Sequence, residues 1–561
     1  MSYSTIDLAV IIAYFAILMF VGWWKGRGKQ ASSGAYFFSR GTLPWWAIGC
    51  AYAAAGMNTE QLIGQNGMGY TVGLTVVNWY YTIVPIVYGA LIFFFFPVYL
   101  RSKISTLPEY LGRRFDDRSK NVFAILLLVS YIFLNLAVVF YGGARVLHGV
   151  FGWSFMGWML VLAFVAGFYT MYGGMSSMTY TAVAQFVLIV GAGFVLFFLA
   201  YNKLPNGWSD VVTHSPGGFH LFQPMDYDVI PWHAIPLTLL GLHLFYSCTN
   251  QAMVQRGFGA KTEWDARLAI IFVGFFVFLR PFIEIFPGMI ARALAFMGHS
   301  EFDIGITTPG ASVDVDMVFP MLINNLVPAG LKGLIVAGIL SSVMSTISAF
   351  LNSISTLITF DVYKKWIRKD ATDKQLVRVG VIATLVLMAF GVLYSPVIGL
   401  FGGIFMYFQA FASYLAVPIA TVFLFGIFWK RATPTAAFVV MVAGIPIGAV
   451  VSILMGGIPI AEALPWTASF LPLFSQEAID AYSLDNFFVG AGVTQAICIL
   501  LLVGVSLVTK PKPVEEIAPV MWAKKMLRLP EGEPKRHFLA SSGFWWVMLL
   551  AFYAVVVIYL R

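Results

Sequence analysis

The sequence is poor in charged residues and in cysteine. Only 11% of its 561 residues are Asp, Glu, Lys or Arg, whereas soluble globular proteins have roughly 25%. This shortage excludes a soluble enzyme, because 60% of the residues are hydrophobic and the mean hydropathy is +0.83. Cys50, Cys248 and Cys498 lie far apart in apolar stretches, so the sequence predicts neither a disulfide framework nor a cysteine-based metal cluster.

What the chain has in abundance is hydrophobic stretches of about 20 residues, the length that an α-helix needs to cross a bilayer. Fourteen such stretches lie between charged residues, Pro or Gly, at 8–24, 45–64, 74–100, 122–141, 155–169, 180–200, 235–254, 268–289, 333–360, 377–394, 398–429, 436–455, 487–508 and 544–560. A lipid-exposed segment must satisfy its own backbone hydrogen bonds, which favours helices. The sequence therefore predicts an all-α polytopic membrane protein with about 14 transmembrane helices.

The positions of the basic residues give these spans an orientation. With fourteen spans, 28 of the 34 Lys and Arg fall on one side of the membrane, which the positive-inside rule identifies as the cytoplasm. The opposite side carries acidic loops at 296–330 and 457–486 that contain no Lys or Arg. We therefore expect a cell-membrane protein with both termini outside, and we attribute the net charge of +8 to this orientation and not to a nucleic-acid partner.

Two spans carry polar residues at positions that interrupt a transmembrane helix. In span 45–64, Gly56 and Met57 precede four polar residues that include Glu60, and span 235–254 has a similar polar run. Broken helices of this kind form binding sites in transporters, because their unwound backbone exposes carbonyl and amide groups. Helix packing is the alternative reason for small and polar residues at such positions.

The two broken spans begin on opposite sides of the membrane in the predicted topology. They therefore indicate a core at 44–429 made of two five-helix repeats of inverted topology, 44–200 and 233–429. Outside this core we expect an outer N-terminus, a peripheral helix and a basic inner loop in 1–43, peripheral helices in 430–508, a basic cytoplasmic linker in 509–540 and a last helix in 541–561.

The ninth span has hydroxyl side chains on one face. Ser342, Ser345 and Thr346 are spaced at i, i+3 and i+4, which places them together on a helix. Neutral oxygens of this kind, completed by carbonyls from a broken helix, suit a hard monovalent cation, whereas transition metals prefer His, Cys or paired carboxylates. A polar packing stripe is the alternative interpretation.

Six stretches in order along the chain carry a family resemblance. They are 36–46, Glu60-Gln61-Leu62-Ile63-Gly64, Thr106-Leu107-Pro108-Glu109-Tyr110-Leu111, Tyr172-Gly173-Gly174-Met175, 250–256 and 344–363. Together they resemble the sodium/solute symporter family over essentially the whole chain, and within it the bacterial sodium–sugar (galactose/glucose) branch. The resemblance implies a core of five plus five helices in inverted repeats, a sodium ion as the cofactor, and a sodium site between the first and eighth core helices.

The resemblance also assigns oxygen ligands to the sodium ion. The implied ligands are the backbone carbonyls of Ala54, Met57 and Ser342 and the hydroxyls of Ser345 and Thr346. Some members of the family bind a second sodium with the aspartate of a Thr-Asp pair, but here the pair reads Thr181-Ala182. We therefore expect one sodium per solute.

The solute residues match the family only in part. Gln61 and Gln409 match sugar-binding glutamines, and Tyr246 matches the aromatic that closes the site. We add Glu60, interpreted as a structural acid bonded to the broken helix, and His243, which replaces a binding asparagine.

Three further pocket positions depart from the sugar pattern. Tyr80 and Ile83 stand where sugar transporters have Glu and Ser, and Val277 stands where they have Lys. These changes keep a carboxylate, an amino acid or a vitamin open as the substrate. In the same region we expect Arg280 and Glu284, at i and i+4, to form a salt bridge that lowers the free-energy cost of their burial.

The function that the sequence predicts is sodium-coupled symport of a small polar solute, a sugar or polyol, by alternating access. The partners are then the solute, sodium and membrane lipid, and we expect a functional monomer. No nucleophile motif or phosphate loop indicates an enzyme. A transporter-like membrane sensor is the alternative from another class, although such a sensor would usually carry an added signalling domain.

Overall fold

The structure is a computed structural model that describes residues 5–26, 41–214, 220–308, 311, 313–400, 403–455, 475–534 and 536–560. Within these residues the chain is helical, with two isolated β-bridges and no strand. The prediction of an all-α protein is therefore confirmed for the part of the chain that the structure describes.

The chain forms two compact units, each built from several segments. The first unit comprises Met1–Val77, Tyr131–Leu221 and Gln255–Phe408, and the second comprises Asn78–Ser130, Phe222–Val254 and Gln409–Arg561. Each unit takes helices from both of the predicted repeats. Residues that are far apart in the sequence therefore meet inside one unit.

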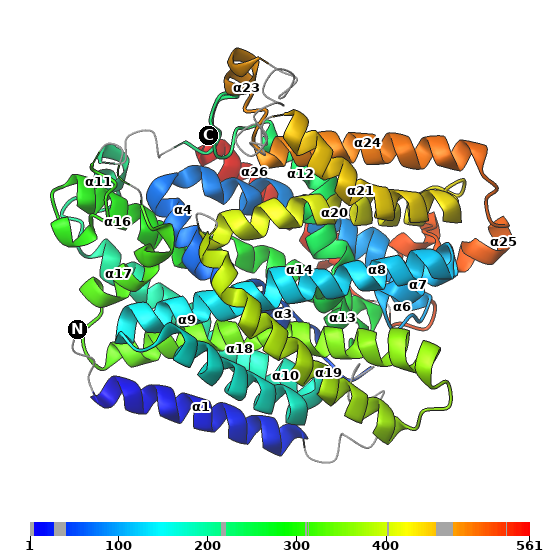
Figure 1. Cartoon of the computed structure of the whole chain (residues 1–561), viewed down its shortest axis with the longest axis horizontal. Helices are drawn as coiled ribbons and strands as arrows, with labels where there is room; N and C mark the ends of the chain where they lie inside the picture. Colours follow the sequence, from blue (N-terminus) through cyan, green and yellow to red (C-terminus); the bar gives the residue numbers. More distant parts are fainter. Residues whose placement is uncertain are drawn as a thin grey trace. The chain divides into compact units, whose positions relative to one another are not determined.

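The first unit holds most of the helices that concern the candidate site. Its main helices are α1 (Thr5–Gly26), α3 (Trp45–Gly56), η2 (Glu60–Gly64), α4 (Gln65–Thr71), α9 (Ala137–Phe151), α10 (Phe155–Tyr201), α11 (Trp208–Thr213), α14 (Glu263–Val277), α15 (Arg280–Glu284), α16 (Phe286–Phe296), η10 (Val315–Met317), α17 (Val318–Leu326), α18 (Leu331–Leu357), η11 (Ile358–Ile367) and α19 (Asp373–Tyr394). Helices α1, α10 and α18 lie side by side (Figure 1), and α3 packs against α10, α14 and α18.

Small residues allow these helices to approach closely. A Cβ atom added at Gly338 on α18 would lie 2.5 Å from the Cβ of Ala192 on α10, and one added at Gly288 on α16 would lie 2.0 Å from the carbonyl oxygen of Asn66 on α4. Such close backbone contacts replace the hydrophobic effect as a source of helix association in lipid.

Two buried carboxylates hold the N-terminal ends of helices in this unit. Asp7 on α1 accepts hydrogen bonds from the backbone amides of Gly330 and Gly333 at 3.0 and 2.7 Å, at the start of α18. Asp316 on η10 accepts from the amide of Ile404 at 3.1 and 3.2 Å, at the start of α20 (Ile404–Phe428). Both carboxylates accept hydrogen bonds from amides that have no partner inside their own helix. A negative charge at this end of a helix is also stabilised by the helix dipole.

The predicted interruptions of the second and seventh spans are confirmed. The second span leaves the helix at Met57 and Asn58, between α3 and η2. The seventh span consists of α12 (Ala234–Thr238), η7 (Leu239–His243) and η8 (Phe245–Thr249), and it breaks at Asn250, which has an extended backbone, before α13 (Gln251–Phe258). The eighth span is also divided, into α14, α15 and α16, because Pro281 and Pro287 cannot continue a preceding helix.

Nine helices within the described residues are long and apolar enough to cross a membrane. They are Leu74–Arg101, Asp117–Phe151, Thr181–Tyr201, Leu331–Ile367, Asp373–Gly399, Ile404–Phe428, Pro434–Leu454, Phe487–Val508 and Ser542–Leu560. Three other predicted spans, 45–64, 235–254 and 268–289, fall on interrupted helices, whose separate pieces are shorter than a bilayer requires. The remaining two, 8–24 and 155–169, lie on α1 and on the first part of α10. The total of fourteen stays a prediction.

One boundary differs from the prediction. The single helix α10 covers both the fifth and the sixth predicted spans, 155–169 and 180–200. The intervening sequence contains neither proline nor a charged residue, and the helix continues through the glycines at 173 and 174.

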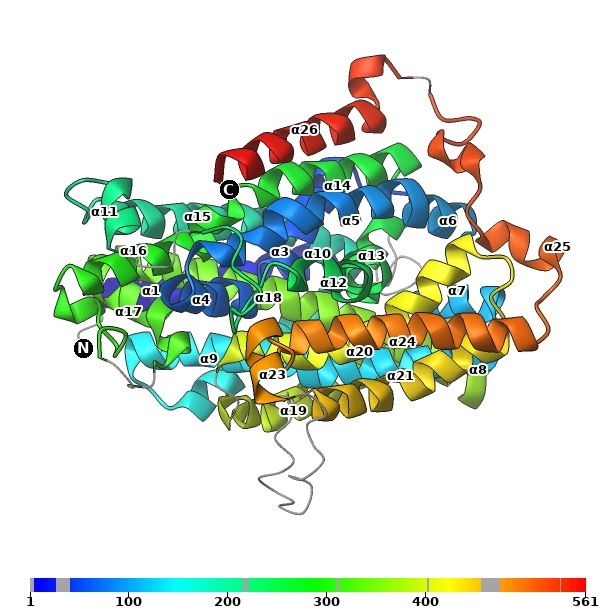
Figure 2. The ribbon, with the colours of Figure 1, turned by 90° about the horizontal axis from the view of Figure 1, so that it is seen from above.

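The second unit consists largely of long apolar helices. Its main elements are η4 (Trp79–Ile83), α5 (Val84–Ala90), η5 (Leu91–Phe95), α6 (Phe96–Arg101), α7 (Leu107–Arg114), α8 (Asp117–Ser130), α21 (Pro434–Leu454), α23 (Gln476–Tyr482), α24 (Phe487–Val508), α25 (Val514–Ile517) and α26 (Ser542–Leu560). Helices α21 and α24 lie side by side (Figure 2). The buried Arg114 closes the end of α20, donating to the carbonyls of Gly426 and Trp429 at 2.7 and 2.8 Å.

Candidate functional site

The end of α3 presents backbone carbonyls in the interior of the first unit. Met57, the residue after the last helical position, has φ −97° and ψ 66° and so leaves the helical path. Its amide still donates to the carbonyl of Ala53 at 3.1 Å, but the carbonyls that follow have no helical continuation. Ala54, Ala55 and Met57 are fully buried, so these oxygens must find partners inside the protein.

Helix α18 supplies hydroxyl groups to these carbonyls. The Ser342 hydroxyl donates to the carbonyl of Met57, and the Thr346 hydroxyl donates to the carbonyl of Ala55 at 3.3 Å. Both side chains are fully buried. The hydroxyl face that the sequence predicted on the ninth span therefore lies against the broken end of the second span.

Ser345, the third predicted hydroxyl, is 1% exposed, and its Oγ has no hydrogen-bond partner in the described part of the chain. An unpaired hydroxyl in an apolar interior costs about 1–3 kcal/mol. Other buried hydroxyls share this feature, Ser353 among them, and Ser345 differs from Ser353 in lying next to Thr346 and three residues after Ser342 on α18.

The electrostatics at the broken end of α3 favour a cation. The C-terminal end of a helix carries a partial negative charge, and α3 ends at these carbonyls. Within the described residues no group of three or more His, Cys, Asp or Glu could hold a metal ion. Carbonyl and hydroxyl oxygens without such groups are the ligands of hard cations.

The predicted solute residues of the first unit form one network. The side-chain oxygen of Gln61 accepts from Arg280 at 3.0 Å, and its amide nitrogen donates to the buried Glu60. Arg280 also forms the predicted salt bridge with Glu284, at 3.0 Å. The sequence pattern revealed that pair, but gave no sign that Arg280 contacts Gln61 or that it donates to the carbonyl of Gly56 at 3.1 Å.

The other predicted solute residues belong to the second unit. The His243 ring lies edge-on to that of Trp79, with centroids 5.0 Å apart, and its Nε2 has no hydrogen-bond partner among the described residues. Tyr246 is half-buried on η8, and Gln409 is buried on α20. Of the predicted solute residues, Glu60 and Gln61 are joined by a hydrogen bond.

Ala182, which stands at the position of the aspartate that the family resemblance led us to look for, is buried on α10 beside Thr181. Helix α10 packs against both α3 and α18, the helices that carry the candidate cation oxygens. Alanine offers no side-chain oxygen at this position.

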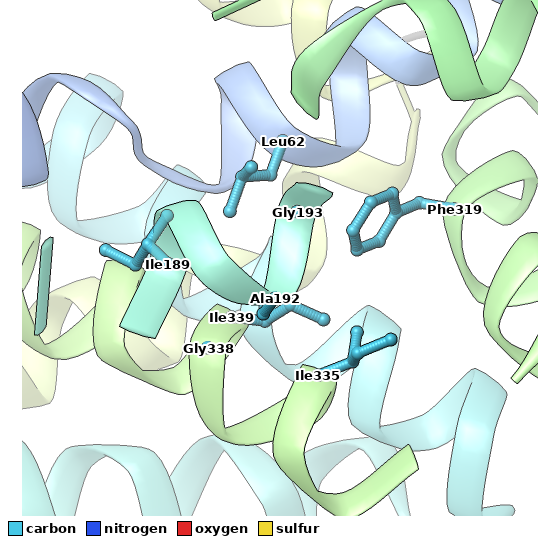
Figure 3. Close-up of a pocket in the computed structure, with 8 residues that line it drawn as sticks. All are labelled: Leu62, Ile189, Ala192, Gly193, Phe319, Ile335, Gly338 and Ile339. Carbon is cyan, nitrogen blue, oxygen red and sulfur yellow. The ribbon is translucent and has the colours of Figure 1, made fainter. Parts of the chain in front are cut away.

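A small cavity lies close to the broken helix but has a different character. Figure 3 shows its lining, which consists of Leu62, Ile189, Ala192, Gly193, Phe319, Ile335, Gly338 and Ile339. All eight are apolar or glycine, so the cavity suits neither an ion nor a polar solute.

The long apolar helices and the buried break in α3 define a multi-pass membrane protein with the architecture of a secondary transporter. The family model for the sodium:solute symporter family matches residues 36–444. The chain belongs to this family, as the sequence motifs predicted.

Curated relatives and a solved structure agree with this assignment. A sodium/glucose cotransporter of Vibrio parahaemolyticus is 32% identical over 485 residues, which cover 83% of this chain and 89% of that protein. Human sodium/glucose cotransporter 4 is 30% identical over 559 residues, covering 95% and 80%. The structure of a Na⁺-coupled sialic acid symporter matches with a TM-score of 0.74 at 21% identity, covering 91% of this chain and 99% of that one, and supports the fold alone.

Proposed function

We propose that this protein couples the entry of sodium to the uptake of a small, polar, uncharged solute, a sugar or polyol, by alternating access. The observation that carries the proposal is the meeting of the α18 hydroxyls with the carbonyls at the broken end of α3. Family membership makes sodium coupling the expected chemistry of that meeting point.

Sodium is a transported substrate in this proposal. Its ligands are the carbonyls of Ala54, Met57 and Ser342 and the hydroxyls of Ser345 and Thr346. All five residues are buried, and the Ser345 hydroxyl has no hydrogen-bond partner among the described residues. The Thr346 hydroxyl would keep its hydrogen bond to the Ala55 carbonyl and turn a lone pair to the ion, and the Ser342 hydroxyl would keep its hydrogen bond to the Met57 carbonyl.

For the solute, we propose hydrogen bonds from Gln61 and Gln409 to hydroxyl groups, with Tyr246 closing the site. Glu60 orients the Gln61 amide, as their hydrogen bond indicates, and the Nε2 of His243 is available for a further hydroxyl.

The charge beside Gln61 supports an uncharged solute over a carboxylate. The guanidinium of Arg280 is bound to Glu284, to the Gly56 carbonyl and to Gln61 itself. A substrate carboxylate would have to displace at least one of these partners, one of which is a buried opposite charge. A hydroxyl-rich neutral solute needs no such exchange.

The proposal includes one sodium per solute, because the buried Ala182 cannot supply an anionic oxygen to a second ion. It also includes fourteen spans with both termini outside, inverted repeats at 44–200 and 233–429, and a functional monomer in the cell membrane. The breaks at Met57–Asn58 and at Asn250 fall in the first helix of each proposed repeat, which supports this division.

Uptake by proteoliposomes tests the proposal. Purified protein would be supplied with labelled glucose, galactose, sorbitol, a monocarboxylate or an amino acid, with an inward gradient of sodium or of potassium. We expect accumulation of a sugar or polyol with sodium only, abolished by a sodium ionophore. Accumulation of the acid alone would favour the carboxylate alternative, and equal uptake in sodium and potassium would refute sodium coupling.

A further inference from the structure

The side chain of Arg280 contacts two parts of the broken helix at once. Its Nη2 donates to the carbonyl of Gly56 at 3.1 Å and to the side-chain oxygen of Gln61 at 3.0 Å. Its Nε donates to both carboxylate oxygens of Glu284 at 3.0 and 3.1 Å. The Arg280 side chain is 11% exposed and that of Glu284 is fully buried, so this arrangement lies inside the first unit.

Gly56 occupies a special place in the broken helix. The carbonyls on either side of it, those of Ala55 and Met57, accept the hydroxyls of α18. Side chains from two different helices therefore hold three successive carbonyls, with α18 on the outer two and α15 on the middle one. The guanidinium that holds Gln61 therefore contacts the same short segment of backbone that would bind sodium.

We propose that Arg280 is a positioning residue that links the sodium site to the solute site. This inference rests on the proposed function and deepens it. When sodium binds, it restrains the carbonyls at the end of α3. Arg280, which is bonded to the Gly56 carbonyl, then restrains the side-chain amide of Gln61 five residues further along the chain. The amide then points in the direction in which a solute can bind.

Arginine suits this role better than lysine because its planar fork holds several acceptors in fixed directions. The Nη2 group contacts the Gly56 carbonyl and the Gln61 side-chain oxygen, while Nε and Nη2 both remain 3.0–3.1 Å from the carboxylate of Glu284. A lysine ammonium is a single point charge at the end of a flexible chain, and it would retain the charge balance with Glu284 while losing the geometry.

Hydrogen exchange with sodium as the only ligand tests this link without knowledge of the solute. The full-length protein in detergent would be compared in sodium and in equimolar potassium, for peptides that cover 53–58 and 60–66. In the parent protein we expect sodium to slow exchange in both segments. In Arg280→Lys we expect sodium to slow exchange at 53–58 as it does in the parent. The factor by which sodium slows exchange at 60–66 should be roughly tenfold smaller than in the parent.

Arg292→Lys is the matched control. Arg292 on α16 donates to the carbonyls of Tyr70 and Thr71 at 3.0 and 2.8 Å, at the end of α4. It is thus another arginine that holds carbonyls at a helix end, away from Gly56 and Gln61, and its replacement should leave the sodium response of both segments unchanged.

The outcomes separate this inference from the proposed function. A parent protein whose exchange is the same in sodium and potassium would contradict the sodium site itself. A parent that responds, together with an Arg280→Lys variant that responds equally at 60–66, would overturn the inference alone, as would equal losses in Arg280→Lys and Arg292→Lys. If Arg280→Lys does not fold, Glu284→Gln loosens the same guanidinium and should reduce the response at 60–66 while sparing 53–58.

Discussion

Ser345 allows a direct perturbation of the proposed ion site with little disturbance of the fold. Its hydroxyl is buried and makes no hydrogen bond within the described residues. Removing an unpaired buried hydroxyl does not break an internal bond, so Ser345→Ala should fold with a stability close to that of the parent. The same change removes one of the five oxygens proposed for sodium.

The expected loss of sodium affinity follows from the strength of a polar contact to a charge. Such contacts contribute about 1.5–3 kcal/mol, which corresponds to a rise of roughly 10- to 150-fold in the sodium dissociation constant. Thermal unfolding in detergent measures this without a solute, because an ion that binds only the folded state raises the midpoint as its concentration exceeds its dissociation constant. Potassium at the same concentrations provides the ionic-strength reference.

Ser353→Ala is the matched control for this measurement. Ser353 lies on the same helix, is also fully buried, and its hydroxyl likewise has no partner within the described residues. It lies eight residues further along α18 and takes no part in the proposed site. Sodium stabilisation that is unchanged in Ser345→Ala, or weakened equally in both variants, would refute the reasoning that places sodium at Ser345.

Three further predictions concern the solute site, the ion count and the outer loop. Gln61→Ala and Gln409→Ala should each weaken solute binding about 5- to 150-fold, since each removes hydrogen bonds worth about 1–3 kcal/mol; parent-like affinity in both would place the pocket elsewhere. With one sodium per neutral solute, a potential of about 100 mV and a tenfold sodium gradient should sustain roughly 500-fold accumulation. Reversal potentials measure this ratio, Ala182→Asp should steepen the sodium dependence, and a ratio of two in the parent would contradict the single-ion account. Burial raises the pKa of Asp316 to about 6, so loop 313–317 should be best protected from hydrogen exchange below about pH 4 and should lose about 3 kcal/mol of protection as the pH rises through 6. Asp316→Asn should remove this dependence, and a variant that retains it would assign the titration to another group.

The local features of the site could be predicted from the sequence. Gly56 before a polar run indicated where the second span breaks, and the spacing of Ser342 and Thr346 indicated one helix face. These signals act over a few residues, because helix periodicity and turn chemistry are local properties. The pair of Arg280 and Glu284 was predictable for the same reason, since it lies within one helical turn.

The long-range contacts could not be predicted in this way. Asp7 holds the start of α18, more than 300 residues away, and Arg280 reaches Gly56 across 224 residues. Nothing in the neighbouring sequence of Asp7 or Arg280 specifies such a partner, which depends on how the helices pack. The hydrogen bond from Thr346 to the carbonyl of Ala55 depends in the same way on the geometry of the helix end.

The central claim is that sodium and solute cross the membrane together. The most direct test is to let a solute gradient drive sodium uptake. Proteoliposomes would hold equal sodium inside and outside, with the membrane potential clamped at zero, and a solute accumulated in the uptake screen would be added outside only. Coupled transport predicts that the inward solute gradient drives sodium-22 to a concentration above that of the medium, with about one ion entering per solute molecule. Solute entry without net sodium-22 uptake would contradict the account.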